Sequence, residues 1–233
     1  MTLRSCFLGL VGLCVASVVY AQSQSVLPGL GDGARRELID VNTAPWHILA
    51  RVQTELGVRC TGFAVAPTVV MTAAHCLWLP ETKHYIQPAD VHVLMRYDHG
   101  RYRLHAHVRR FIIPRGYDPA NESATASEDR ATLLLDQPVV TVADLLPVVP
   151  VQDGARAMLV GYPQDRNEVP FGDLDCHING VTVSGLVHHD CEATRGVSGA
   201  PLLIRTSGGA WGIGGLAVRA DVGPGGLAAP LLR

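Results

Sequence analysis

Residues 194–201 read TRGVSGAP and place a serine hydroxyl among small neighbours. Gly196 and Gly199 flank Ser198, and Pro201 closes the stretch. Gly, Ser and Pro are the usual residues of tight turns, so a turn alone would account for this composition. A nucleophile needs the same pattern, because neighbours without a Cβ atom let a substrate backbone approach the hydroxyl closely. Ser198 is therefore a candidate nucleophile.

Two further stretches carry the side chains that such a serine requires. In VVMTAAHCLWL, His75 follows small residues and stands beside Cys76, where a disulfide would fix the histidine backbone. In SEDRATLLLDQPV, Asp129 opens a strand pattern of alternating apolar residues, which puts its carboxylate at a buried strand entrance. Taken singly, they also fit an ordinary half-buried histidine and a solvated aspartate. Their order along the chain, His, Asp, Ser, favours the chemical interpretation.

In that order, the three stretches resemble the chymotrypsin-like (trypsin-fold) serine peptidases, in particular the bacterial secreted branch related to glutamyl endopeptidases. The resemblance rests on TAAHC, D-x-A-x-L-x-L and G-x-S-G-x-P-L, and it covers residues 38–231. It implies that Ser198 attacks the substrate, His75 removes and returns the proton, and Asp129 orients His75. It also implies an oxyanion hole formed by the backbone amides of Gly196 and Ser198.

The resemblance implies an all-β fold of two six-stranded antiparallel β-barrels with the active site in the cleft between them. The first barrel is expected at about 38–140, a linker at about 141–150 and the second barrel at about 151–233, within a peptidase domain of residues 38–233. The residues themselves also favour an all-β fold, because the chain from Ile48 onward consists of short apolar runs separated by turn residues.

The N-terminus predicts export. Residues 1–21 combine a basic start with an uncharged apolar run, and Val19 and Ala21 precede a cut before Gln22, as in a signal peptide. Residues 22–37 are rich in Gly, Ser and Gln and contain an Arg-Arg pair, which predicts a flexible arm or a processed pro-segment. We therefore expect a secreted or periplasmic protein with no membrane partner once the signal is removed.

Charge and cysteine content narrow the possible functions. The formal net charge is −2 and the sequence has no run of basic residues, so no nucleic-acid partner is expected. An even number of cysteines outside the signal indicates disulfides with three possible connectivities, and the lack of any CxxC pair argues against a zinc site. The resemblance implies a Cys60–Cys76 bridge at the histidine loop, and a Cys176–Cys191 bridge would brace the walls leading to the nucleophile loop.

The resemblance also locates a specificity pocket beside Ser198. Its floor would include Glu192, Ala193 and Thr194, with Glu192 facing either a basic substrate side chain or solvent. Its lining strand would include Ala217, Val218 and Arg219.

Several positions in and beside this pocket depart from the family pattern, whose lining strand often ends Ser-Trp-Gly where this chain has Val218, Arg219 and Ala220. Val197 replaces an aspartate that pairs with a newly cut N-terminus in the pancreatic-type enzymes, so trypsin-style activation is not expected. Val218 replaces a serine that bonds to the buried aspartate, and we expect this loss to lower activity. Ala217 falls where glutamyl endopeptidases place a substrate-reading histidine, so the sequence gives no direct support for glutamate specificity.

We therefore predict a monomeric, secreted serine endopeptidase that acts on protein or peptide substrates without a cofactor or metal. The alternative is a catalytically silent homologue that binds a partner through the same cleft. The pairs His105/His107 and His188/His189 also suggest metal ligands. Because no acidic residue stands at ligand spacing, we interpret them as solvated strand faces.

Overall fold

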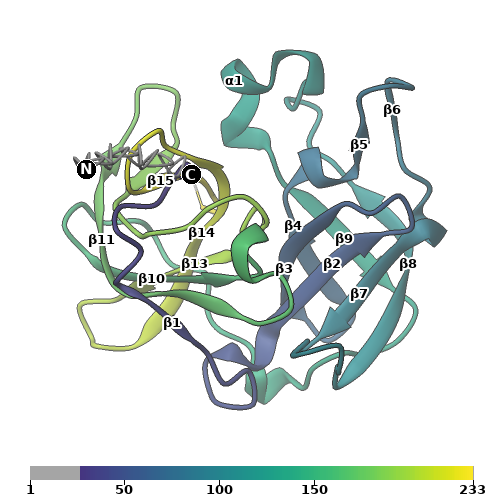
Figure 1. Ribbon diagram of the computed structural model, residues 1–233, viewed down its shortest axis with the longest axis horizontal. Helices are drawn as coiled ribbons and strands as arrows, with labels where there is room; N and C mark the ends of the chain where they lie inside the picture. The colour runs from purple at the N-terminus through teal and green to yellow at the C-terminus, as the bar shows by residue number, and fades with distance from the viewer. Residues whose placement is uncertain (1–26, 233) are drawn as a thin grey trace, which may run out of the picture.

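The computed structural model describes residues 27–232 and contains two closed antiparallel β-barrels (Figure 1). This arrangement confirms the predicted fold class. The predicted signal peptide and residues 22–26 lie outside the described residues. Within residues 27–232, no helix has the length and apolar character needed to cross a membrane.

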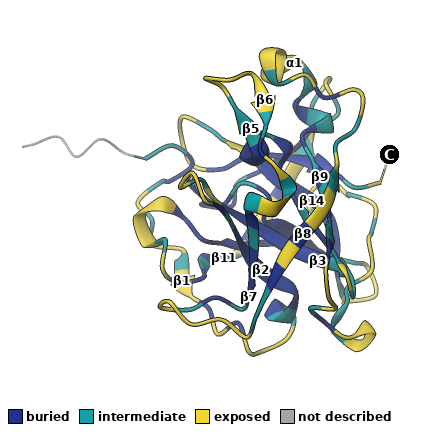
Figure 2. Ribbon diagram, turned by 90° about the vertical axis from the view of Figure 1, so that its right-hand side faces the viewer, coloured by how far each residue is buried: buried dark blue, intermediate teal, exposed yellow. Residues whose placement is uncertain are grey.

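The first barrel closes from six strands in the order β2-β3-β4-β9-β8-β7. Alternate residues of β9 are buried, as its sequence pattern predicts, and Ala106 and Val108 of β8 also point into the core. Exposed residues of β8 lie between them on the outer face (yellow in Figure 2). The strands are β2 (Leu49–Thr54), β3 (Arg59–Ala66), β4 (Val69–Thr72), β7 (Val91–Met95), β8 (Leu104–Ile112) and β9 (Ala131–Leu135).

The second barrel closes in the order β11-β10-β13-β14-β15-β12, because β12 also pairs with β11, and β1 adds to the outer side of β11. Strands approach closely here: a Cβ atom on Gly172 would lie 2.2 Å from the carbonyl oxygen of Leu159. The strands are β1 (Arg36–Leu38), β10 (Arg156–Gly161), β11 (Phe171–Val181), β12 (Val187–His189), β13 (Pro201–Arg205), β14 (Trp211–Ala220) and β15 (Gly226–Pro230).

Helical segments in the described part of the chain are short, in agreement with the lack of sustained helical periodicity in the sequence. Two of them position candidate catalytic residues: η2 contains His75, and η5 ends at Asp129. The segments are η1 (Trp46–Ile48), η2 (Ala74–Leu77), η3 (Pro88–Asp90), η4 (Pro119–Asn121), α1 (Glu122–Thr125), η5 (Ala126–Glu128), η6 (Val142–Asp144) and η7 (Gln164–Arg166), and a hairpin joins β5 (Trp78–Leu79) to β6 (His84–Tyr85).

The N-terminal arm, here residues 27–35, packs against the second barrel instead of lying free (Figure 1). The amide of Gly29 donates to the carbonyl of Asp221 at 2.7 Å, and its carbonyl accepts from the amide of Ala193 at 3.1 Å. The described part of the segment that we predicted as a flexible arm or a processed pro-segment is therefore hydrogen-bonded to the second barrel. The partners that hold the arm lie more than 130 positions along the chain, where no local pattern could indicate them.

Two disulfides join the cysteines in the pairing that we expected. Cys60–Cys76 links β3 to η2, and Cys176–Cys191 links β11 to the loop after β12. Their partners are 16 and 15 positions apart. Closing a loop of this length stabilises the folded state by about 3 kcal/mol through the lost entropy of the unfolded chain.

Candidate active site

His75 is held by three restraints that arise within the first barrel. It lies in η2, where the disulfide of the adjacent Cys76 anchors the segment to β3. Its backbone amide donates to Oδ1 of Asp129 at 3.0 Å, and its ring Nδ1 lies 2.6 Å from Oδ2 of the same carboxylate. Because a carboxylate oxygen accepts, Nδ1 carries the proton. The neutral ring therefore presents an unprotonated Nε2, as a general base requires.

Asp129 occupies the C-cap of η5, just before β9, and it is fully buried. Burial alone would lower the pKa of His75, but the hydrogen bond with Asp129 and the negative charges of Asp129 and Glu122 outweigh it. The net effect raises the pKa of His75, because the nearby negative charges stabilise the protonated ring. The pair can therefore accept a proton and hold it, as general acid–base chemistry requires.

Ser198 and His75 line one pocket of about 450 Å³. The carbonyl of Ser198 accepts from the amide of Thr61 at 2.9 Å, so the loop that carries Ser198 is bound to β3 of the first barrel. Among residues 27–232, the Ser198 hydroxyl has no hydrogen-bond partner. Catalytic hydrogen bonds are often long before substrate binds, so the shared pocket is the informative feature.

The loop before Ser198 orients two backbone amides. The carbonyl of Arg195 accepts from the amide of Gln164 at 2.7 Å, and a planar trans peptide points its N–H to the opposite side. That N–H belongs to Gly196, whose φ of +90° favours glycine and whose Cβ would lie 2.4 Å from the carbonyl oxygen of Tyr162. Within the described chain, the amides of Gly196 and Ser198 donate to no other group. Both are available for an oxyanion.

Thr61 is a positioning residue that sequence reasoning missed. It is fully buried between the barrels, its hydroxyl donates to the carbonyl of Gly196 at 2.9 Å, and it accepts from the amide of Tyr162. The only signal in the sequence is a threonine beside Cys60, and its partners lie about a hundred or more positions away.

Most of the predicted pocket residues do lie together. Ala193, Thr194, Ala217, Val218 and Arg219 all line the pocket with Gly196 and Ser198. Val218 is buried, and its side chain has no group that could donate a hydrogen bond to Asp129. The two oxygens of Asp129 instead accept from the backbone amide and the ring of His75. Pro28 of the arm also forms part of the wall.

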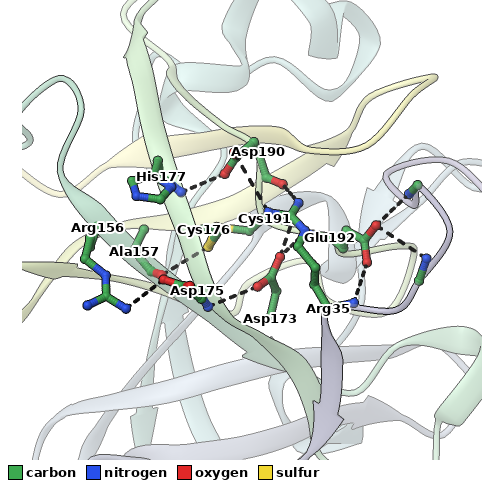
Figure 3. A network of polar contacts seen from close by, with 12 residues as sticks. Arg35, Arg156, Ala157, Asp173, Asp175, Cys176, His177, Asp190, Cys191 and Glu192 are labelled. Carbon is green, nitrogen blue, oxygen red and sulfur yellow. Dashed lines mark hydrogen bonds and ion pairs between the residues drawn. A yellow bond between two sulfur atoms is a disulfide. The ribbon is translucent and has the colours of Figure 1, made fainter.

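Glu192 is not part of the pocket, and its predicted place in the floor is wrong. Its buried carboxylate turns toward the arm and accepts from the amides of Gly31, Gly33 and Arg35 at 3.1–3.4 Å. Figure 3 shows this carboxylate facing the arm backbone, with the Arg35 side chain reaching between Asp173 and Asp190. Neither a basic substrate side chain nor solvent is its partner. Glu192 instead fastens the arm to the second barrel.

His189 is a pocket residue that the sequence did not reveal. It lies on β12, it is 2% exposed, and neither ring nitrogen has a hydrogen-bond partner among the described residues. Burial lowers its pKa to about 4, so the ring is neutral near pH 7. The hydroxyl of Thr194 is likewise buried and unpartnered. Two polar groups in the pocket wall are therefore free to bind a substrate side chain.

Two groups of metal-ligand types occur at the site, but both are committed to other bonds. One contains Cys60 and Cys76, whose sulfur atoms form a disulfide and so cannot act as thiolate ligands. The other joins Glu122 to His75 and Asp129, which already hydrogen-bond to each other at 2.6 Å. The arrangement is suited to proton transfer beside an alcohol.

Comparisons with known proteins agree with this geometry. The family model described as "Trypsin-like peptidase domain" matches residues 60–213, a range that contains His75, Asp129 and Ser198. A solved structure titled "Structure of Glu endopeptidase in complex with MPD" is similar with a TM-score of 0.71 and 21% identity, covering 88% of this chain and 94% of that chain. At this identity the likeness shows the fold. No match was found among the curated proteins.

Proposed function

Because the chain belongs to the trypsin-like peptidase family and is a serine endopeptidase, we propose that it is exported and cleaves peptide bonds through an acyl-enzyme on Ser198. The observation that carries this proposal is the double contact of Asp129 with His75, in a pocket that His75 shares with Ser198. The two disulfides are in keeping with an oxidising compartment.

In the first step, Oγ of Ser198 attacks the scissile carbonyl carbon while Nε2 of His75 takes the hydroxyl proton. The imidazolium then gives this proton to the leaving amine, and the peptide C–N bond breaks to leave an ester on Ser198. A water molecule then attacks the ester carbon while Nε2 of His75 takes its proton. The C–O bond to Ser198 breaks as His75 returns the proton to Oγ, which releases the carboxylic acid product. Asp129 stays ionised and stabilises the imidazolium in both halves.

The negative charge that develops on the carbonyl oxygen would be met by the amides of Gly196 and Ser198. These donors are oriented before substrate arrives, since the amides of Gln164 and Ala200 bind the carbonyls of the two peptide groups to which the donors belong. Removing one donor of this kind from a serine peptidase reduces kcat by about 10²–10³.

The pocket favours polar or acidic substrate side chains before the cut bond. Its wall contains His189, Thr194, Arg195 and Arg219, and no carboxylate is among the described lining residues. A lysine or arginine side chain would therefore meet like charge, whereas an acceptor group would satisfy the unpartnered atoms of His189 and Thr194. Cleavage of a peptide library tests this: dominant cutting after basic residues would contradict it.

Fluorophosphonate labelling tests the nucleophile. The oxidised wild-type protein should react covalently, the Ser198→Ala variant should not, and the exposed Ser207→Ala variant should react like wild type. Absence of labelling in correctly oxidised wild-type protein would instead favour the catalytically silent binding homologue. Labelling that persists in Ser198→Ala would place the nucleophile elsewhere.

A further inference from the structure

Three histidines gather on the outer face of the first barrel, and none of them lines the active-site pocket. His92 lies on β7, while His105 and His107 lie on β8. His92 is directly opposite His107 in the antiparallel register, and Ala106 between the two β8 histidines is fully buried. Because side chains alternate across a strand, all three imidazoles project from the same outer face.

The rings are close enough to share one ion. Their centroids are 4.6 Å apart for His105 and His107, 5.1 Å for His92 and His105, and 5.5 Å for His92 and His107. One ring nitrogen from each lies within 4.8 Å of the others, and Nδ1 of His92 is 3.0 Å from Nε2 of His105. Nitrogen ligands around a tetrahedral zinc ion are about 3.3 Å apart. Small rotations of partly exposed rings would therefore complete the set.

Glu55 provides the acidic partner that the sequence spacing did not show. Its Oε1 lies 3.7 Å from Nε2 of His92, while the other ring nitrogen of His92 faces His105. A histidine that binds a metal through one nitrogen commonly directs its second N–H to a carboxylate, which fixes the ring and increases its basicity. Glu55 is placed for this role.

The contact between two of the rings requires an unprotonated nitrogen. Nδ1 of His92 and Nε2 of His105 lie 3.0 Å apart, so one of these two nitrogens must accept the hydrogen bond with its lone pair. A metal ion requires the same lone pair from an imidazole ligand. The interpretation of His105 and His107 as a solvated strand face does not explain why a third histidine, His92, contacts both of them.

We propose that His92, His105 and His107 bind one divalent transition-metal ion of the zinc type, with water in the remaining position and Glu55 supporting His92. Imidazole suits zinc, copper and nickel, and three such ligands in contact on two adjacent strands form a preassembled set. The bound ion would join β7 to β8 from outside the barrel. This site is independent of the peptidase chemistry.

Calorimetric titration with zinc chloride at neutral pH tests the proposal. The parent protein carries Ser198→Ala to prevent self-digestion and His75→Ala to remove the histidine–carboxylate cluster of the active site. One zinc ion should bind per chain. Losing an outer carboxylate typically weakens metal binding by about 10–100-fold, so Glu55→Gln should weaken zinc binding by about 10-fold or more. Losing a ligand in His105→Gln or His107→Gln should weaken zinc binding more than Glu55→Gln does.

The matched control is His84→Gln, which changes an exposed histidine on β6 outside the cluster and should leave zinc affinity unchanged. Cobalt provides a second readout, because a four-coordinate ion gives intense visible absorption and a hydrated six-coordinate ion does not. Three outcomes would each overturn the proposal. They are no zinc binding by the parent, a zinc affinity in His105→Gln and His107→Gln equal to that of the parent, and a six-coordinate cobalt spectrum.

Discussion

The two barrels hold their shares of the active site by different means. In the first barrel, His75 and Asp129 are fixed by a disulfide and two hydrogen bonds between segments of that same barrel. In the second, the loop of Ser198 bonds to Gln164 of its own barrel but also depends on outside partners: Thr61 from the first barrel, and the arm, held by Glu192 and Ala193. His75 and Asp129 are thus positioned within one barrel, whereas the Ser198 loop and its pocket also need contacts from outside the second barrel.

The largest effect should come from the local half of the site. Asp129→Asn keeps the shape of the side chain but lets its amide face Nδ1 of His75 as a donor, which favours the wrong tautomer. We expect kcat to fall by about 10⁴, with a free energy of unfolding close to wild type. Kinetics with a peptide ester, together with urea unfolding, measure both. A loss of less than tenfold in kcat would show that Asp129 does not orient the base.

The next-largest effect should come from removing the disulfides, since each barrel has one and the kinetic consequences should differ. In a Ser198→Ala background, removing either bridge by paired Cys→Ala substitution should lower the free energy of unfolding by about 3 kcal/mol, because the two loops are equally long. In the active protein, loss of Cys60–Cys76 should mainly lower kcat, since it releases His75. Loss of Cys176–Cys191 should mainly raise KM. Identical kinetic signatures would remove the distinction between the barrels.

The same contrast explains what the sequence could predict. The histidine and serine motifs predicted the residues that share the pocket, because each is a short segment whose neighbours fix its conformation. The alternation in β9 predicted the buried position of Asp129. These are properties of a few consecutive residues.

Glu192, Thr61 and His189 could not be predicted in the same way. The three amides that Glu192 binds are about 160 positions away, and backbone amides carry no signature in a sequence. In the sequence, His189 is one of two adjacent polar residues, yet strand alternation buries it and leaves His188 partly exposed. The arm has the composition of a flexible segment, and only its long-range partners make it ordered.

A third prediction compares His189 of the second barrel with His75 of the first. The folded pKa of His189 lies near 4, below the ordinary value of 6.5, so the unfolded chain binds a proton that the folded chain excludes. Stability from this group is fully present above pH 6.5 and should fall by roughly 3 kcal/mol as the pH drops to 4. His75 has a raised pKa, so its contribution has the opposite sign and is lost as the pH rises through that pKa.

Urea unfolding across this pH range in a Ser198→Ala background measures the effect. His189→Leu should remove most of the acid-induced loss, whereas His84→Gln should leave the loss unchanged. An equal loss in the His189→Leu variant would mean that another group controls acid stability. Activity should also decline at low pH, with a midpoint above 6.5 that reflects protonation of His75.

The smallest expected effect tests whether the arm shapes the pocket. Glu192→Gln replaces one carboxylate oxygen by an NH₂ group that faces amide donors, so at least one of the three bonds from Gly31, Gly33 and Arg35 is lost. A hydrogen bond to a charged group contributes about 1.5–3 kcal/mol, so we expect the free energy of unfolding to fall by about 2 kcal/mol.

The kinetic signature of Glu192→Gln separates arm docking from general destabilisation. Pro28 lines the pocket and Gly29 bonds to Ala193 in its wall, so a loosened arm should raise KM several-fold and leave kcat nearly unchanged. Glu37→Gln is the matched control, since Glu37 is exposed on β1 in the segment that follows the arm, and it should change neither value. If Glu192→Gln lowered kcat without raising KM, the arm would act on the Ser198 loop itself and not on the pocket wall. Unchanged stability and kinetics would show that the second barrel keeps its pocket without the arm, and the contrast between the two barrels would no longer hold.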